Sequence, residues 1–299
     1  MRAVPCALAR RLRERAFTLV EMMVSLTIGF IVVGALLASY LAAARTGGAT
    51  DAMQQMTEDA TEALSVMRTQ VAMAGFATPN LAGGPLALRG QITPMFGCDK
   101  SAFADLASKA DASLACAGKE DSDTLEVAYE AVAGADASAP SNAILDSTGA
   151  PLDCIGNAIP AEEGVNPPLH VNDSKFFVVA KTVPPTLNCY AHGAKAGAPL
   201  VDNIERLEVT YGFNDSRVGA PSNQIVAYGP APPWHDAHWD HVVAVTLCVQ
   251  VRSAGQVIGQ SERAALGNYV DCGGQARSSS DGYMRRTFAT TVVLQNALL

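Results

Sequence analysis

The densest group of possible metal ligands in the chain lies between His235 and His241. Three histidines, His235, His238 and His241, fall within seven residues together with two aspartates. Imidazole and carboxylate groups could together hold zinc or another transition metal. Steps of three residues, however, suit neither a helix pair at i, i+4 nor one face of a strand. We therefore favour a solvated loop anchored by Trp234 or Trp239, with a metal site as the weaker alternative.

Sequence signatures of catalysis are missing from the chain. It contains no G-x-S-x-G nucleophile elbow, no H-E-x-x-H pair, no phosphate-binding loop and no dinucleotide fingerprint. Scattered serines, histidines and carboxylates are too common to indicate a site. The sequence thus predicts a protein that is not an enzyme and needs no cofactor.

Cysteines form a second group with defined chemistry. Of the seven, Cys6 precedes the apolar stretch described below and six follow it. An even number in an oxidising compartment indicates disulfides, although six cysteines can pair in many ways. We favour neighbours in sequence, each closing a polar loop worth about 3 kcal/mol on the chain-entropy model. The expected pairs are Cys98–Cys116, Cys154–Cys189 and Cys248–Cys272.

The third feature is one carboxylate, Glu21, inside an apolar stretch that runs from Phe17 to Ala44. These 28 residues are enough to cross a bilayer as a helix, and Glu21 is their only formal charge. A carboxylate there costs roughly 2.5–3.5 kcal/mol on insertion scales and generally has a partner. Five arginines precede the stretch, so its start is expected on the cytoplasmic side and the rest of the chain beyond the membrane.

A cut between Ala16 and Phe17 would give Glu21 such a partner. The basic segment ends at Ala16, and the apolar segment begins abruptly at Phe17. Cleavage there creates a cationic amino terminus, which could pair with the Glu21 carboxylate of a neighbouring subunit when the helices pack side by side. The pair would also fix the axial stagger between subunits. The simpler alternative is an uncut signal anchor in which Glu21 faces a neighbouring helix by chance.

These residues resemble a known leader. Residues 15–21, RAFTLVE, followed by an unbroken apolar helix, are similar to the class III leader of type IV pilins and pseudopilins. The chain has Ala16 where that family usually has glycine before the cut. Two later segments, 201–212 and 284–292, resemble the PilW family of minor pilins. The resemblance touches both ends of the chain.

The resemblance implies a function and a set of partners. A prepilin peptidase would cut between Ala16 and Phe17 and methylate Phe17, and Glu21 would be the assembly contact. The protein would first span the inner membrane once, with its head in the periplasm, and then enter a cell-surface type IV pilus. It would prime pilus assembly and lie near the tip. Its partners would be other minor and major pilins, the inner-membrane assembly platform and, at the tip, an adhesin.

Two other functions stay open at this point. A pseudopilin of a type II secretion system would use the same helix in a periplasmic piston. An uncut, membrane-anchored periplasmic enzyme or metal-binding protein would instead centre on residues 235–241. Nucleic-acid binding is not expected, because loss of residues 1–16 takes the formal net charge from −8 to −12 and leaves no basic patch.

Three segments are expected to position these groups: a leader (1–16), a long helix (17–76) and a globular head (77–299). The helix divides into a transmembrane part (17–44) and an amphipathic part (51–75). Strands that lie far apart in the chain, with no long helical pattern between them, favour a largely antiparallel sheet. The predicted fold is therefore α+β and pilin-like, with the helix on the sheet and disulfides stapling the loops.

Hydrophobic periodicity locates the elements within these segments. The amphipathic part carries a helical stripe made of Met53, Met56, Ala60, Ala63, Met67 and Val71. Gly47-Gly48 is expected to kink or locally melt the helix, and Gly75 to end it. A short helix is expected over residues 101–112. Strands are expected over 124–130, with one face buried, and over 176–180, 187–192, 207–213, 243–251 and 288–294.

Overall fold

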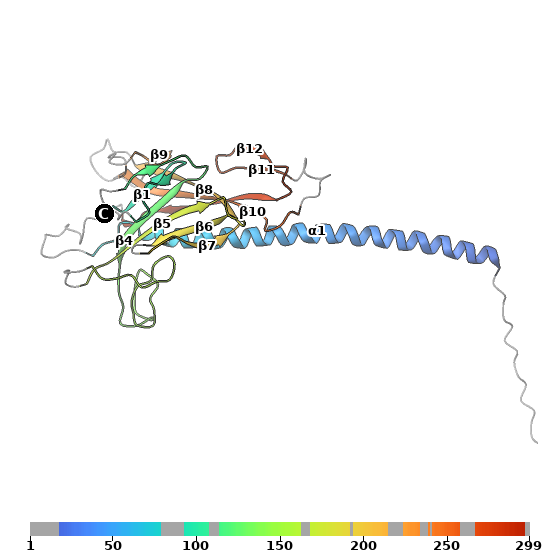
Figure 1. The fold of residues 1–299 in the computed structure, drawn as a ribbon, viewed down its shortest axis with the longest axis horizontal. Helices are drawn as coiled ribbons and strands as arrows, with labels where there is room; N and C mark the ends of the chain where they lie inside the picture. The colour runs from blue at the N-terminus through green and yellow to red at the C-terminus, as the bar shows by residue number, and fades with distance from the viewer. Residues whose placement is uncertain are drawn as a thin grey trace, which may run out of the picture. The chain divides into compact units, whose positions relative to one another are not determined.

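The computed structural model describes residues 18–78, 93–107, 114–162, 168–191, 194–214, 224–233, 239, 241–257 and 267–296. The chain divides into two compact units, Met1–Thr50 and Asp51–Leu299. Helix α1 (Leu19–Met73) contributes to both (Figure 1). The prediction that the helix melts locally at Gly47-Gly48 is wrong, because α1 is helical through both residues. Each glycine costs only about 1 kcal/mol against alanine, and the helix continues for many turns on either side.

The second unit is built on antiparallel sheets (Figure 1). The first sheet has the strand order β1-β4-β5-β6-β7 and the second the order β13-β10-β8-β9. The first comprises β1 (Met95–Cys98), β4 (Thr124–Ala131), β5 (His170–Val179), β6 (Thr186–Ala191) and β7 (Ala198–Asp202). The second comprises β8 (Ile204–Asn214), β9 (Ile225–Gly229), β10 (Val242–Arg252) and β13 (Arg285–Val293). Two hairpins pair β2 (Ala102–Phe103) with β3 (Cys116–Ala117), and β11 (Asn268–Val270) with β12 (Ala276–Ser278).

The amphipathic part of α1 supplies one wall of the hydrophobic core. The predicted stripe is buried: Met56, Ala60, Ala63, Met67 and Val71 are almost inaccessible to solvent, and Met53 is half-buried. Inward-facing side chains of both sheets belong to the same cluster. A fully buried methionine or valine contributes about 1.5–3 kcal/mol relative to an exposed one, so this stripe is a principal source of stability for the head.

Two hydrogen bonds fix the axial position of α1 on the sheets. The Asn203 amide donates to Asp59 Oδ2 at 2.9 Å, and the Asn172 amide donates to Gln70 Oε1 at 2.7 Å. Asn203 lies in the tight connection between β7 and β8 with a φ of +66°, a left-handed conformation that asparagine tolerates. Burial raises the pKa of Asp59 above its ordinary value. These directional contacts define how far along its axis the helix sits on the sheets, which apolar packing alone does not define.

The C-terminal end of α1 is capped by the last described residues of the chain. Gly75 has a φ of +73°, and the Phe76 N–H donates to the Met73 carbonyl at 2.9 Å, so the helix ends where Gly75 was expected to end it. The Asn296 side-chain amide then donates to the carbonyls of Met73 and Ala74, each at 3.3 Å. Carbonyls that have no partner within the helix are thereby satisfied.

Strand β4 departs from its prediction because both of its faces are buried. The alternation places Leu125, Val127 and Tyr129 in the core, as expected. The other face was expected to meet solvent, yet Glu126 and Glu130 are also buried. Glu130 accepts hydrogen bonds from the backbone and hydroxyl of Thr78, and Glu126 faces an ion partner on β5. Polar partners therefore let ionisable side chains occupy a buried face.

The short helix expected over residues 101–112 is wrong where the structure describes that segment. Residues 101–107 form β2 and turns, whereas 108–113 lie outside the described residues. Phe103 is buried with its ring centroid 6.1 Å from that of Phe96. The hairpin with β3 and the disulfide beside it override the helix propensity of the alanines, which is only a weak preference.

Gly97 in β1 approaches Tyr211 so closely that no side chain fits there. A Cβ atom at this position would overlap the Tyr211 hydroxyl and lie 3.1 Å from the Thr124 carbonyl oxygen. We expect Gly97→Ala to destabilise the head by about 1–3 kcal/mol, because overpacking forces neighbouring groups to move. Thermal unfolding of the purified protein measures the effect as a lower Tm.

Tyr211→Phe provides the matched control for Gly97→Ala. The Tyr211 hydroxyl is buried, and in the described part of the chain it neither donates nor accepts a hydrogen bond. Its removal should therefore be neutral or slightly stabilising. The double variant should recover part of the stability lost in Gly97→Ala. A Gly97→Ala protein that melts at the wild-type temperature would contradict the close approach.

Candidate functional site

The first described turn of α1 is closed by a side-chain cap. The Glu21 N–H donates to Thr18 Oγ1 at 3.2 Å, and the Met22 N–H donates to the Thr18 carbonyl at the same distance. Thr18 and Glu21 thus have the T-x-x-E spacing of a capping box. A carboxylate in the first turn also interacts favourably with the positive end of the helix dipole. Glu21 therefore has a local role in starting the helix, which the sequence analysis did not identify.

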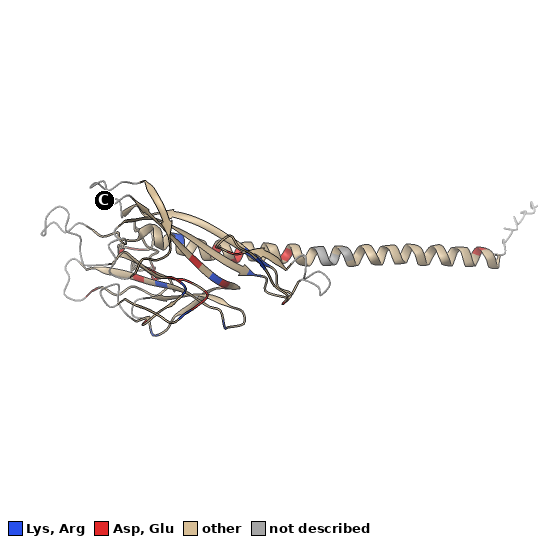
Figure 2. Ribbon diagram, turned by 90° about the horizontal axis from the view of Figure 1, so that it is seen from above, with Lys and Arg blue, Asp and Glu red and all other residues tan. Residues whose placement is uncertain are grey.

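Beyond the cap, α1 is apolar and fully exposed within its own unit. Leu19–Leu41 is long and apolar enough to cross a membrane, with a mean hydropathy of 2.2, and none of it is buried. In Figure 2 this part of the helix carries a single acidic position near its start. The hydroxyls of Ser25 and Thr27 bond to carbonyls one turn back, so they need no outside partner. Such a surface requires lipid or other helices around it.

One face of this span has a shallow depression suited to close helix packing. Its lining residues are Met22, Ser25, Leu26, Gly29, Phe30 and Val33. Ser25 and Gly29 lie one turn apart, and the space next to the Gly29 Cα is open. Small residues at this spacing let two helix backbones approach closely in a membrane. The depression begins one residue after Glu21, so a helix packed there would lie beside the carboxylate.

Several predicted site residues lie outside the described residues. Ala16 and Phe17, the expected cleavage and methylation positions, are among them, as are His235 and His238. His241 is described, and its Nδ1 lies 3.0 Å from Asn214 Oδ1. The described residues contain no group of three possible metal ligands. The cleavage site and the metal site thus stay predictions.

Trp239 anchors its segment on the head, as the loop interpretation expected of Trp234 or Trp239. Its ring centroid lies 5.2 Å from that of Tyr211, edge to face, and 5.7 Å from that of Phe96. Its indole N–H donates to the Pro233 carbonyl at 3.2 Å. These contacts join the segment before β10 to both hydrophobic clusters of the head.

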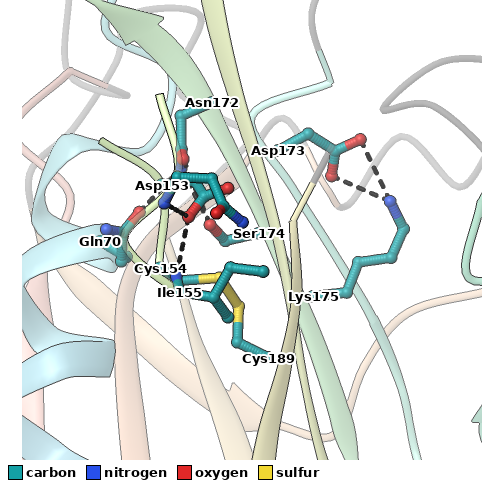
Figure 3. Close-up of a disulfide and its surroundings, with 10 residues drawn as sticks. Gln70, Asp153, Cys154, Ile155, Asn172, Asp173, Ser174, Lys175 and Cys189 are labelled. Carbon is teal, nitrogen blue, oxygen red and sulfur yellow. Dashed lines mark hydrogen bonds and ion pairs between the residues drawn. A yellow bond between two sulfur atoms is a disulfide. The ribbon is translucent and has the colours of Figure 1, made fainter. Parts of the chain in front are cut away.

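Three disulfides staple the head, and they join the sequence neighbours that we favoured. Cys98–Cys116 links β1 to β3, Cys154–Cys189 links a loop to β6, and Cys248–Cys272 links β10 to the turn after β11. Their Cα–Cα distances of 5.7, 6.4 and 5.8 Å are normal for disulfides. Figure 3 shows Cys154–Cys189 beside Asn172 and Ser174 of β5. Cys189 is fully buried in the main core.

A partly buried ion network joins the two segments on which the family resemblance rested. Arg285 at the start of β13 donates from Nε and Nη2 to the two carboxylate oxygens of Glu205 in β8, at 2.7 and 2.8 Å. It also bonds Asp281, whose pKa it holds well below the usual range. Gln250 of β10 donates to the same Glu205 carboxylate at 3.0 Å. The sequence does not reveal the Glu205–Arg285 pair, because β8 and β13 lie on either side of β10 and only the sheet order brings the two residues together.

Comparisons with known proteins agree with these features. Residues 11–37 match the family model described as the prokaryotic N-terminal methylation motif. Residues 175–296 match the model of the type IV pilus-assembly protein W family, PilW. A search of curated proteins finds no significant match. Among solved structures, the type IV-like pilin TTHA1219 from Thermus thermophilus is similar, with a TM-score of 0.40 and 11% identity over 81% of this chain and 98% of that chain. A TM-score this low carries no argument, so the resemblance to pilins rests on the two family models.

The methylation motif at the start of a capped, apolar, exposed helix defines a type IV pilin-like protein. The match over residues 175–296 covers β8, β10 and β13 with their Glu205–Arg285 pair. The two family matches together support a PilW-like type IV minor pilin. The pilin class is structural rather than catalytic, and its members act with other pilus components.

Proposed function

We propose that this protein primes the assembly of a type IV pilus and is incorporated into it near the tip. A prepilin peptidase would cut between Ala16 and Phe17 and methylate the new amino terminus. The helix from residue 17 onward would hold the subunit in the inner membrane, with the head in the periplasm, and would then carry it into the fibre. Other minor and major pilins, the assembly platform and a tip adhesin would be its partners.

The observation that carries the proposal is the placement of Glu21. It is the only charge between residues 17 and 44, it lies in the first turn of an apolar helix, and it borders the Ser25–Gly29 depression. The cap occupies the Glu21 backbone but does not neutralise its carboxylate. In a membrane, a cationic amino terminus of a packed neighbour would provide the missing charge.

The size of the head supports a location in the pilus that only a few subunits occupy. The head is large, acidic overall and stapled by three disulfides, which form in oxidising compartments beyond the inner membrane. A subunit repeated thousands of times along a thin fibre needs a compact head, whereas a subunit at the tip has no such restriction. The size of the head therefore favours the tip over the shaft.

The decisive experiment is amino-terminal sequencing of the protein recovered separately from membranes and from sheared surface pili. Proteins that begin with methylated Phe17 in both fractions would support the proposal. An intact arginine-rich leader on protein inside pili would overturn it. Processed protein that stays in the envelope and is missing from pili would instead indicate the pseudopilin of a type II secretion system.

A further inference from the structure

Three ionisable side chains are buried together between β4 and β5. Glu126, Asp173 and Lys175 each expose no more than 2% of their surface. Lys175 Nζ lies 2.9 and 3.1 Å from the two carboxylate oxygens of Asp173 and 3.2 Å from Glu126 Oε1. Glu126 and Lys175 are directly opposite each other in the antiparallel register. Figure 3 shows Asp173 and Lys175 on the side of β5 away from Gln70 and Ser174.

The surroundings of one acid in this trio, Glu126, favour its neutral form. Burial raises the pKa of Glu126 well above its ordinary range, and the nearby Asp173 carboxylate raises it further than Lys175 lowers it. Two carboxyl groups in contact in a dry site share a proton, because two adjacent negative charges are costly there. Among the three groups, Glu126 is therefore the one that its surroundings favour as the neutral acid.

The contact between Lys175 and Glu126 is close without being a hydrogen bond. Within the described part of the chain neither Glu126 oxygen has a hydrogen-bond partner, although Nζ lies only 3.2 Å from Oε1. The lysine nitrogen thus lies beside the carboxyl group and outside its hydrogen-bonding directions. A nucleophile next to a neutral carboxylic acid, with a carboxylate in contact to take its proton, has the arrangement needed for acyl transfer.

We propose that Lys175 and Glu126 condense into an amide that covalently joins β4 to β5. Asp173 accepts one proton from the Lys175 ammonium group, and the resulting amine attacks Cδ of the Glu126 carboxylic acid. The N–C bond forms, the C–OH bond breaks, and the hydroxyl leaves as water with a second proton from the nitrogen. The products are a secondary amide, one water molecule and a protonated Asp173. No group is oxidised or reduced.

The surroundings favour this condensation over the separated groups. Packing holds the two reacting groups in contact, which replaces the entropy loss of a bimolecular reaction. The reactants include two full charges in a site that is closed to solvent, whereas all three products are neutral. The bond would close the long connection between the two strands, residues 132–169, at its base. It would lie on the opposite face of the sheet from the Phe176–Cys189 pair of the core.

Intact mass spectrometry of the full chain, purified with its disulfides formed, tests the proposal. The wild-type protein should be lighter by one water than its sequence mass with three disulfides. Lys175→Arg keeps a cation next to both acids but cannot form the amide, so it should have its full sequence mass. Asp173→Ala keeps the nucleophile and the acid but lacks the base, and most of it should remain uncondensed.

Peptide mapping identifies the bond itself. Trypsin should not cleave after Lys175, so Glu126 and Lys175 should appear in one looped peptide, residues 120–181, that is lighter by one water and whose fragment ions locate the amide. Wild-type protein at its full sequence mass overturns the proposal, and so does an amide that maps to Asp173. The wild-type mass decides the question by itself, even where a variant does not fold.

Discussion

Glu21→Ala is expected to leave the protein inserted in the membrane but to reduce its incorporation into pili at least about tenfold. Removing one member of a buried ion pair typically costs several kcal/mol, and each 1.4 kcal/mol is a factor of ten in an equilibrium. Membrane insertion should persist or improve, because the substitution removes the only charge from the span. Quantification of the protein in membrane and sheared-pilus fractions measures both effects.

Glu21→Gln separates the charge of Glu21 from its role in the helix cap. Glutamine also suits the third position of a capping box, so this variant keeps the start of α1 and loses only the negative charge. If the carboxylate pairs with a neighbouring amino terminus, Glu21→Gln should be as defective as Glu21→Ala. Normal incorporation of the glutamine variant would show that the negative charge of Glu21 is not required, and the paired-charge mechanism would fail.

Loss of the Cys154–Cys189 disulfide should have the second large effect. On the chain-entropy model, a link across 35 residues contributes about 4 kcal/mol. For a head of this size, the Cys154→Ala/Cys189→Ala variant should melt roughly 10 °C below the wild type. The measured loss of stability also includes the packing of the Cys189 side chain, because this residue is fully buried in the core. Differential scanning calorimetry of the purified protein under non-reducing conditions measures the shift.

The Cys98–Cys116 pair provides the matched control. It links residues only 18 apart, and Cys116 lies in the exposed strand β3. Its double alanine variant should therefore lose less, about 3 kcal/mol on the same model. Equal melting temperatures for the wild type and the Cys154→Ala/Cys189→Ala variant would contradict the assigned role of that bridge.

The sequence predicted best the features that periodicity specifies directly. The buried stripe from Met56 to Val71 and the inward residues of β8, β10 and β13 follow from spacing alone, because each element buries one apolar face. The T-x-x-E cap at Thr18 depends on equally local spacing, although the sequence analysis did not identify it. Hydrophobic periodicity thus located the core-facing residues and the class of fold.

Features that depend on tertiary contacts were beyond such rules. An alanine-rich segment became β2 and turns because Phe103 packs on Phe96 of β1 and pairs with Cys116 across the hairpin. β4 was expected to have a solvent-facing side, yet Glu126 is buried because β5 places Lys175 opposite it. Nothing in a single sequence specifies that register. The same reason explains why the Glu126–Asp173–Lys175 trio was not identified in advance.

The side-chain amide of Asn296 has a consequence for the order in which the protein matures. Helix α1 ends on carbonyls that accept hydrogen bonds from a residue 223 and 222 positions later, which is synthesised long after the helix. Strand β13, which pairs with β10, is also synthesised long after α1. A prematurely terminated chain would retain its membrane anchor but have a frayed helix end and a bare sheet edge. Cellular proteases can recognise those defects, so only full-length subunits would persist to be assembled.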